Sequence, residues 1–250
     1  ARLTENADDV EEASPTDTIT DNSEPAPAPF VNSAWKKPSD YIAHMLANLP
    51  QDEKLTHDQT LFIAEFAQVC NKVWKEEQDN VPWNEREVHH IVLLGQGGSG
   101  KTHVVQRIVA KTVDFIWPPS SMEDTKLLMV AFSNAQAKNI SFANHRARTI
   151  HNASSMRVQR LVNSRMGPGN QQHQLTQTWL PVRCLIIEEV SMVSAASYNM
   201  HNWRAMCGRG QHCVVSQSTY HHAKSAFGKI PIVIHLGDFL QLKPTNSISL

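Results

Sequence analysis

The chain has 250 residues, 41% of them hydrophobic, and its 23 basic and 24 acidic residues give a formal net charge of −1. This composition supports one large or two small folded domains. The near-neutral charge excludes a global positive field, so any nucleic-acid surface has to be a local patch. The apolar runs are too short to cross a bilayer, so we expect no membrane partner.

Residues 1–38 are predicted to form a disordered tail. Eight acidic residues precede position 25, and a proline-alanine repeat follows at 25–29. Acidic, proline-rich sequence of this kind buries too little apolar surface to fold. The folded domain is therefore expected over residues 39–250.

Two helices are predicted before the first strand. Apolar residues at helical spacing mark one helix from Tyr41 to Leu49, and another begins near position 55. Thr56 and Gln59 have the spacing of a capping box, in which Gln59 closes the start of the second helix. The alternative for Gln59 is recognition of adenine, because an amide both donates and accepts hydrogen bonds. Taken alone, the spacing favours the cap. The polar residues 75–90 are expected to form a loop.

The strongest motif lies at residues 91–102, where an apolar strand leads through G-x-x-x-x-G-K-T into an apolar helix. Strand, glycine-rich loop and helix in this order are typical of a phosphate-binding loop, whereas a chance glycine-rich hairpin needs no such context. Backbone N–H groups and the positive end of the helix would surround the phosphates of ATP. Lys101 is predicted to neutralise the β- and γ-phosphates, and Thr102 to hold Mg²⁺. The candidate nucleotide-binding residues are Gln59, Gly95, Gln96, Gly97, Gly98, Ser99, Gly100, Lys101 and Thr102.

A second strand, residues 127–132, leads into a loop and a helix at 133–140. No acidic residue lies between Asp124 and Glu188, although arginines recur in that stretch. A solvated helix face explains part of this pattern, but a surface that contacts a phosphate backbone explains the missing acids better. The candidate DNA-binding residues are Ser133, Asn134, Arg148, Thr149 and His151.

Residues 166–178, rich in Gly, Gln and Asn, are predicted to form a polar loop. The strand at 182–187 then ends in Glu188 and Glu189, a Walker B arrangement. One carboxylate of such a pair holds Mg²⁺, and the other orients or deprotonates the attacking water. The alternative is a strand end at which two acids simply meet solvent. We predict that Glu188 is a metal ligand and that Glu189 is the catalytic base.

The last predicted strand, residues 230–236, ends in a polar loop with Asp238 and Gln241. Ligands in open α/β sheets sit at the carboxyl ends of strands. Gln241 is therefore predicted to contact the γ-phosphate or its water, and Asp238 to tie the loop to the magnesium site. Four strands that alternate with helices predict an α/β fold with a mostly parallel sheet and helices on both faces.

The four cysteines are irregularly spaced, which favours a reducing compartment over a disulfide framework. Cys207 and Cys213 lie near several histidines, but they lack C-x-x-C spacing. A zinc site is therefore disfavoured.

The order of these motifs resembles the first RecA-like domain of superfamily-one DNA helicases. The likeness is greatest to the PIF-type (petite integration frequency) and RecD-like branch, which includes the helicase part of Helitron transposons. It covers roughly residues 50–250 and rests on the phosphate loop, T-I-H at 149–151, E-V-S-M at 189–192 and G-D-F-L-Q-L-K-P at 237–244. The resemblance implies a RecA-like P-loop NTPase fold.

The resemblance also implies ATP-driven 5′-to-3′ movement on single-stranded DNA, with RNA as the other possible strand. Repair, recombination, telomere maintenance and transposition are the processes it suggests. A nuclear or mitochondrial location is expected in a eukaryote and a cytoplasmic one otherwise, with no secretion. Gln59 would read adenine, Gln241 would sense the γ-phosphate, and the loops at Ser133–Asn134 and Thr149–His151 would meet the strand.

Such helicases bind ATP between two RecA-like domains, and the second domain, which supplies an arginine finger, is missing from this chain. The chain alone is therefore expected to hydrolyse ATP poorly. Two departures concern the site itself. Glu188 stands where the family has Asp, and Phe132-Ser133-Asn134 replaces Pro-Thr-Gly. An ATP-dependent switch without helicase activity, or an inactive mobile-element copy, are the alternative functions.

Overall fold

The computed structural model describes residues 35–83, 85–121, 124–155, 170–210 and 226–238. The predicted tail, residues 1–38, lies outside these ranges except for its last four residues, and Gln241 lies outside them as well. Within the described ranges, no helix combines the length and the apolar character needed to cross a membrane.

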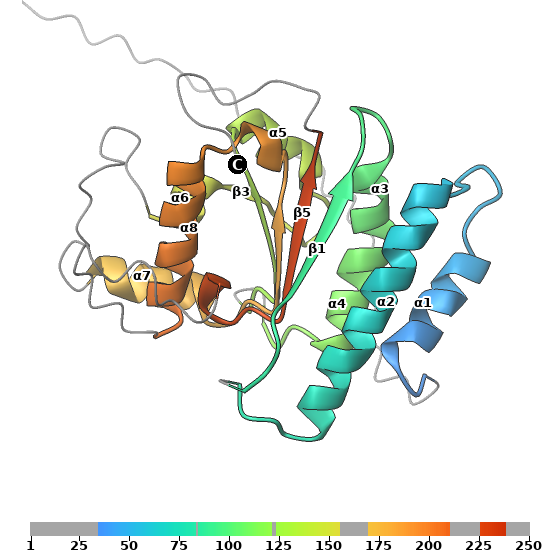
Figure 1. Cartoon of the computed structure of the whole chain (residues 1–250), viewed down its shortest axis with the longest axis horizontal. Helices are drawn as coiled ribbons and strands as arrows, with labels where there is room; N and C mark the ends of the chain where they lie inside the picture. The colour runs from blue at the N-terminus through green and yellow to red at the C-terminus, as the bar shows by residue number, and fades with distance from the viewer. Residues whose placement is uncertain (1–34, 84, 122–123, 156–169, 211–225, 239–250) are drawn as a thin grey trace, which may run out of the picture. The chain divides into compact units, whose positions relative to one another are not determined.

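A five-stranded, wholly parallel sheet forms the centre of the fold (Figure 1). The strands are β1 (His89–Leu94), β2 (Leu127–Ala131), β3 (Arg148–Thr149), β4 (Cys184–Ile187) and β5 (Ile232–Gly237). Their order across the sheet is β1-β5-β4-β2-β3. The predicted α/β fold with a parallel sheet is confirmed, and the two-residue strand β3 is an addition to it. Strands β2, β4 and β5 are buried along their whole length, as expected for parallel strands covered on both faces.

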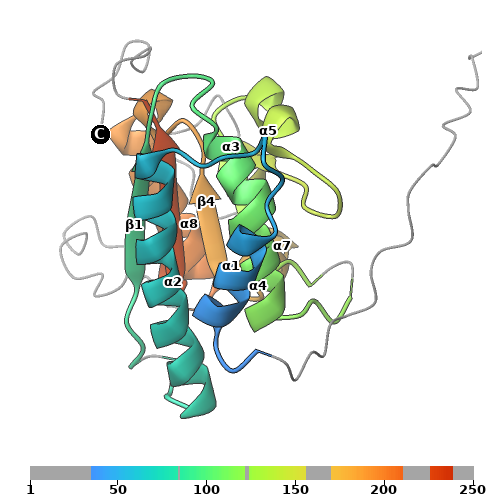
Figure 2. The ribbon, with the colours of Figure 1, turned by 90° about the vertical axis from the view of Figure 1, so that its right-hand side faces the viewer.

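Helices cover both faces of the sheet (Figures 1 and 2). The first face carries α1 (Pro38–Ala47), α2 (His57–Gln78), α3 (Lys101–Val104) and α4 (Ala110–Ile116). Between α3 and α4 the chain makes a single π-helical turn, η1 (Val105–Val109), in which the N–H of Ala110 donates to the carbonyl of Val105. The buried side chains of these helices and of β1 form one continuous apolar core.

The opposite face carries α6 (Ile150–Ala153), α7 (Asn170–Trp179) and α8 (Ala195–Gly208), which pack on β4 and β5 in a second core. The 3₁₀ turns η2 (Val190–Met192) and η4 (Ala226–Gly228) flank α8 in the chain, and α5 (Asn134–Ile140) follows β2.

Two sequence predictions about loops were wrong. The predicted loop at 166–178 contains α7, because Leu175 and Trp179 are four residues apart and both fully buried, and the Trp179 indole donates to the Ala153 carbonyl at 3.0 Å. The Gln and Asn residues that suggested a loop belong to the same helix. Helix α2 also runs on to Gln78, four residues into the predicted loop at 75–90.

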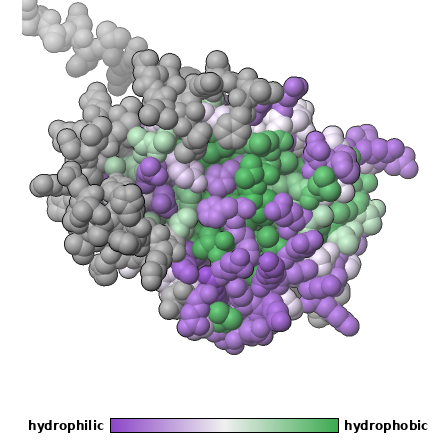
Figure 3. All heavy atoms as spheres, viewed as in Figure 1, coloured by the Kyte–Doolittle hydropathy of each residue, from purple (hydrophilic) through white to green (hydrophobic). Residues whose placement is uncertain are grey.

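The phosphate loop is carried by β1, an edge strand of the described sheet. Residues of β1 alternate between buried and exposed, and Val92 and Leu94 are 53% and 49% exposed. Apolar surface is correspondingly visible in the middle of the face that Figure 3 presents, where β1 runs in Figure 1.

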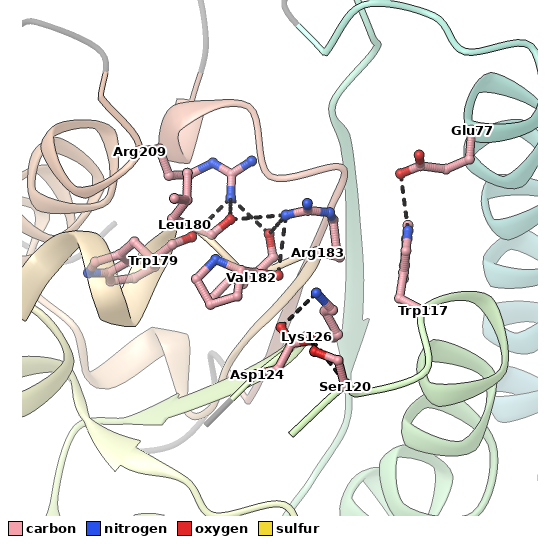
Figure 4. Close-up of polar contacts among 11 residues, drawn as sticks. Glu77, Trp117, Ser120, Asp124, Lys126, Trp179, Leu180, Val182, Arg183 and Arg209 are labelled. Carbon is pink, nitrogen blue, oxygen red and sulfur yellow. Dashed lines mark hydrogen bonds and ion pairs between the residues drawn. The ribbon is translucent and has the colours of Figure 1, made fainter. Parts of the chain in front are cut away.

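At the edge of the sheet where the strands begin, Arg209 binds backbone carbonyls (Figure 4). Its guanidinium donates to the carbonyls of Gly228, Trp179, Leu180 and Val182 at 2.6–3.1 Å. Two of these carbonyls belong to the end of α7 and the residue after it, where helical carbonyls lack intrahelical partners. One side chain thus joins the end of α7 to the turn before β5.

Ion pairs complete this edge (Figure 4). Glu77 accepts a bond from the Trp117 indole at 3.1 Å and pairs with Arg86 at 2.5 Å. Lys126 pairs with Asp124 at 2.6 Å. Burial raises the pKa of Asp124, but the bonds from Lys126 and Ser120 together outweigh it and lower that pKa to about 2.

Candidate active site

The phosphate loop joins β1 to α3, and backbone angles or close contacts favour glycine at three of its positions. Gly98 and Gly100 have φ of 78° and 80°, in the left-handed region that favours glycine. A Cβ atom on Gly100 would lie 2.6 Å from Nε2 of Gln59, and one on Gly95 would lie 2.6 Å from Oγ of Ser99. The loop is therefore packed against helix α2 as well as against itself.

Lys101 begins α3 and is only 7% exposed. Its Nζ donates to the carbonyls of Gly95 at 2.5 Å and Gln96 at 3.2 Å. The same ammonium is close enough to Glu188 to lower the pKa of that carboxyl. The cation predicted to neutralise phosphates is thus fixed between the loop and the carboxylates at the end of β4.

Gln59 closes the predicted capping box and also holds the phosphate loop. Its Oε1 accepts the N–H of Thr56 at 2.9 Å, and Oγ1 of Thr56 accepts the N–H of Gln59 at 3.3 Å. Its Nε2 donates to the carbonyl of Ser99 at 2.8 Å. The cap is therefore confirmed. One amide hydrogen and one acceptor position of Gln59 are not used by these bonds, and its adenine-reading role stays a prediction.

Glu188 follows β4 and is 8% exposed. Burial, and next the charge of Glu189, raise the pKa of Glu188 to about 7, although Lys101 lowers it. Among the described residues, the buried Oε2 atoms of Glu188 and Glu189 have no hydrogen-bond partner. Such atoms are rare in folded proteins, and each calls for a functional or structural explanation.

Glu189 adopts a strained backbone conformation, with φ 50° and ψ 51°. This left-handed region costs a residue with a Cβ about 1 kcal/mol or more. The turn is closed by the N–H of Met192, which donates to the Glu189 carbonyl at 2.9 Å. Because strained residues persist where the surroundings over-determine them, Glu189 is a candidate for a directly functional role.

Residues at this edge fit a magnesium ion. The orphaned Oε2 of Glu188 and the hydroxyl of Thr102, next to Lys101, are hard oxygen donors of the kind that Mg²⁺ prefers. Mg²⁺ takes only one or two protein ligands where phosphates and water supply the rest. The described ranges contain no cluster of three or more His, Cys, Asp or Glu able to hold a metal.

The predicted DNA-binding residues lie at the same edge as Glu188 and Glu189. Strands β2 and β3 pair in parallel, with Ala131 opposite Thr149, so the two predicted strand-contact loops are neighbours. The hydroxyls of Ser133 and Thr149 are used as N-caps of α5 and α6. Asn134 and Arg148 are exposed. His151 is half-buried. Burial, and next the neighbouring His151, lower the pKa of His201 to about 3.

Comparison with known proteins decides the family. A family described as AAA domain matches residues 81–215, just over half of the chain. The chain belongs to this AAA domain family. No curated protein matches it.

Solved structures similar to this AAA domain include Pif1 helicases, which are of the type that the motif order resembles. The Candida albicans Pif1 helicase is 21% identical, with a TM-score of 0.47, over 77% of this chain and 34% of that one. Bacteroides sp Pif1 in complex with ADP-AlF4 is 18% identical, with a TM-score of 0.46, over 78% and 34%. The chain thus spans about a third of the length of the solved structures it matches.

Sequence reasoning assigned no role to Gln136, which joins two segments at this edge of the sheet. Its side chain accepts the N–H of Ser133 at 3.1 Å and donates to Sδ of Met192 at 3.1 Å. The S-x-x-Q spacing at 133–136 signals the first bond as a capping box. No pattern signals the second bond, because its partners are 56 residues apart in the chain.

Proposed function

We propose that the chain is the ATP-binding and ATP-hydrolysing motor domain of a DNA helicase that moves 5′ to 3′ on single-stranded DNA. The observation that carries this proposal is the meeting of three features at one edge of the sheet. These features are the phosphate loop with Lys101, the two carboxylates after β4 with orphaned oxygens, and the exposed Asn134 at the start of α5 and Arg148 in β3.

In this proposal the loop N–H groups and Lys101 bind the phosphates of ATP. Glu188 and Thr102 would hold Mg²⁺, which would supply positive charge to the phosphates when bound. Glu189 accepts a proton from, or orients, the attacking water. The pKa of about 7 means that Glu188 loses its proton fully only above neutral pH in the nucleotide-free protein. Mg²⁺ would then favour the ionised form.

The single-stranded DNA would lie over the ends of β2 and β3. Arg148 supplies a phosphate contact, and Asn134 offers an amide that can donate to phosphate or to a base edge. Ser133 and Thr149 hold the loops through their caps, which makes them positioning residues for these contacts. Participation in repair, recombination, telomere maintenance or transposition stays a prediction.

The test is the rate of ATP hydrolysis with and without oligothymidylate, beside binding of a fluorescent ATP analogue. We expect oligothymidylate to raise the rate of ATP hydrolysis. Glu189→Gln should lower the rate by about a hundredfold or more while leaving the analogue bound. Arg148→Ala should weaken strand binding and reduce its salt dependence by about one phosphate contact.

Each contrary result has a distinct meaning. A hydrolysis rate indifferent to DNA would leave an ATP-dependent switch as the better description. Failure to bind the analogue with Mg²⁺ would favour an inactive copy. Direction of movement is measured on duplexes with a 5′ or a 3′ single-stranded tail, using a chain extended by a second RecA-like domain.

A further inference from the structure

Gln136 lies between the predicted strand-contact loop and the catalytic turn. Its Oε1 accepts the N–H of Ser133 at 3.1 Å, and its Nε2 donates to Sδ of Met192 at 3.1 Å. Met192 in turn donates its N–H to the carbonyl of Glu189 at 2.9 Å. Three consecutive hydrogen bonds therefore connect Ser133 to Glu189.

The sheet brings these two segments together. Strands β2 and β4 are neighbours, with Val130 opposite Ile187. The N–H of Glu188 continues this ladder by donating to the Val130 carbonyl at 2.8 Å. The chain leaves β2 toward Ser133 and leaves β4 toward Glu189, side by side. Beyond this ladder, the side chain of Gln136 joins the two exits.

The cap of α5 does not account for this arrangement. A capping box needs only the acceptor oxygen of the residue at N3, and a glutamate serves there as well as a glutamine. The amide nitrogen of Gln136 adds a donor, which reaches out of its own helix to the sulfur of Met192. Methionine is flexible and its sulfur is a weak acceptor, so the contact can be made and broken at low cost.

We propose that the Gln136–Met192 contact couples the binding of single-stranded DNA at the Ser133–Asn134 loop to the geometry of Glu189. This inference rests on the proposed function. A DNA strand that contacts Asn134 shifts the first turn of α5. Gln136 then transmits the shift through Met192 to the carboxylate of Glu189. Coupling between two sites is reciprocal, so bound nucleotide changes strand affinity by the same factor.

Two substitutions separate this link from the cap. Gln136→Glu keeps an acceptor for the Ser133 N–H and removes the donor to sulfur. Met192→Leu keeps apolar volume and removes the acceptor. Ala135→Glu is the matched control, because it adds the same charge to the exposed first turn of α5 and leaves Gln136 intact.

The measurement is the affinity for labelled oligothymidylate with and without a non-hydrolysable ATP analogue and Mg²⁺. In the wild type we expect the analogue to change that affinity about fivefold or more. In Gln136→Glu, and equally in Met192→Leu, the change should fall to within about twofold, and the double variant should lose no more than either single one. Each ligand alone should bind about as in the wild type, and Ala135→Glu should keep the full coupling.

Wild-type coupling in both link variants would overturn the inference and leave the proposed function standing. A wild type that binds neither the strand nor the analogue would overturn both. Equal loss of coupling in Ala135→Glu would assign the effect to charge and also overturn the link. Thermal unfolding of all variants identifies any loss that merely follows from unfolding.

Discussion

The two edges of the sheet differ in how their charged side chains are held. Where the strands begin, Arg209 donates to four carbonyls, two of which also accept from Arg183, and Glu77 is shared by Trp117 and Arg86 (Figure 4). Where the strands end, buried oxygens of Glu188 and Glu189 have no partner among the described residues. The first edge has the arrangement of a region that stabilises the fold, and the second that of a region kept ready for a ligand.

The same contrast appears in the pKa values of two glutamates. Burial raises the pKa of Glu77, but bonds from Arg86 and Trp117 outweigh it and lower that pKa overall. Burial also raises the pKa of Glu188, and there the adjacent Glu189 adds to the increase. A carboxylate at the first edge thus favours folding at neutral pH, and one at the second edge opposes it.

The largest expected effect is the loss of Arg209. Arg209→Met should lower the free energy of unfolding by about 4 kcal/mol, because the Gly228 and Trp179 carbonyls lose bonds to a charged donor at about 2 kcal/mol each. The carbonyls of Leu180 and Val182 keep Arg183 as a donor. Burial, and next the charge of Arg183, lower the pKa of Arg209 only to about 10, so the side chain is charged at neutral pH. Urea unfolding measures the change. Arg148→Met, at the other edge, should change stability by less than about 0.5 kcal/mol. A loss below 1 kcal/mol for Arg209→Met would contradict the contrast.

The next effect depends on pH. Glu188 has a pKa raised above its unfolded value of 4.5, so its cost to folding grows as pH rises from about 4.5 and is complete above about 7. Glu188→Gln should therefore stabilise the nucleotide-free chain at pH 8, by on the order of 3 kcal/mol, with little effect near pH 4.5. Magnesium-dependent nucleotide binding should be weakened.

Glu77→Gln is the matched comparison. The stability that Glu77 contributes is present above the unfolded pKa and is lost as pH falls through its lowered folded pKa. The substitution should therefore destabilise the chain at pH 8, by about 1 kcal/mol after solvent screening. Thermal unfolding at pH 8 and pH 5 measures the stability change in both variants. A change of the same sign in Glu188→Gln and Glu77→Gln at pH 8 would refute the contrast between the two edges.

The smallest effect concerns backbone strain. Glu189→Gly should raise the free energy of unfolding by about 1 kcal/mol, because glycine adopts φ 50° without the Cβ clash. It should also abolish ATP hydrolysis. Glu189→Gln keeps the strain, so it should remove activity without this gain. A stability gain equal in both variants would attribute it to the lost charge.

Local patterns predicted the phosphate loop and the carboxylate pair, since each is contiguous in the chain. The capping box at Thr56 and Gln59 was predicted as well, but the bond from Gln59 to Ser99 was not. That bond joins residues 40 positions apart and depends on how α2 packs. The link between Gln136 and Met192 was hidden for the same reason.

Composition led to a wrong prediction where a few buried apolar side chains stabilise a helix that is otherwise polar. Helix α7 is mostly Gln, Asn, Thr and His, and its burial depends on Leu175 and Trp179. The edge bound by Arg209 could not be predicted either, because its acceptors are backbone carbonyls, which carry no residue-type signal. The roles of Gln59, Gln241 and the strand-contact residues stay predictions.

The π-helical turn η1 has a consequence for sequence length. A π turn holds one residue more than the α turn that would span the same rise, so Val105–Val109 contains a surplus residue. Deleting one residue there would restore a continuous α-helix from Lys101 and leave the phosphate loop in place. A family member one residue shorter between Lys101 and Ala110 is therefore compatible with the same loop, and a one-position gap there is expected when sequences of this family are aligned.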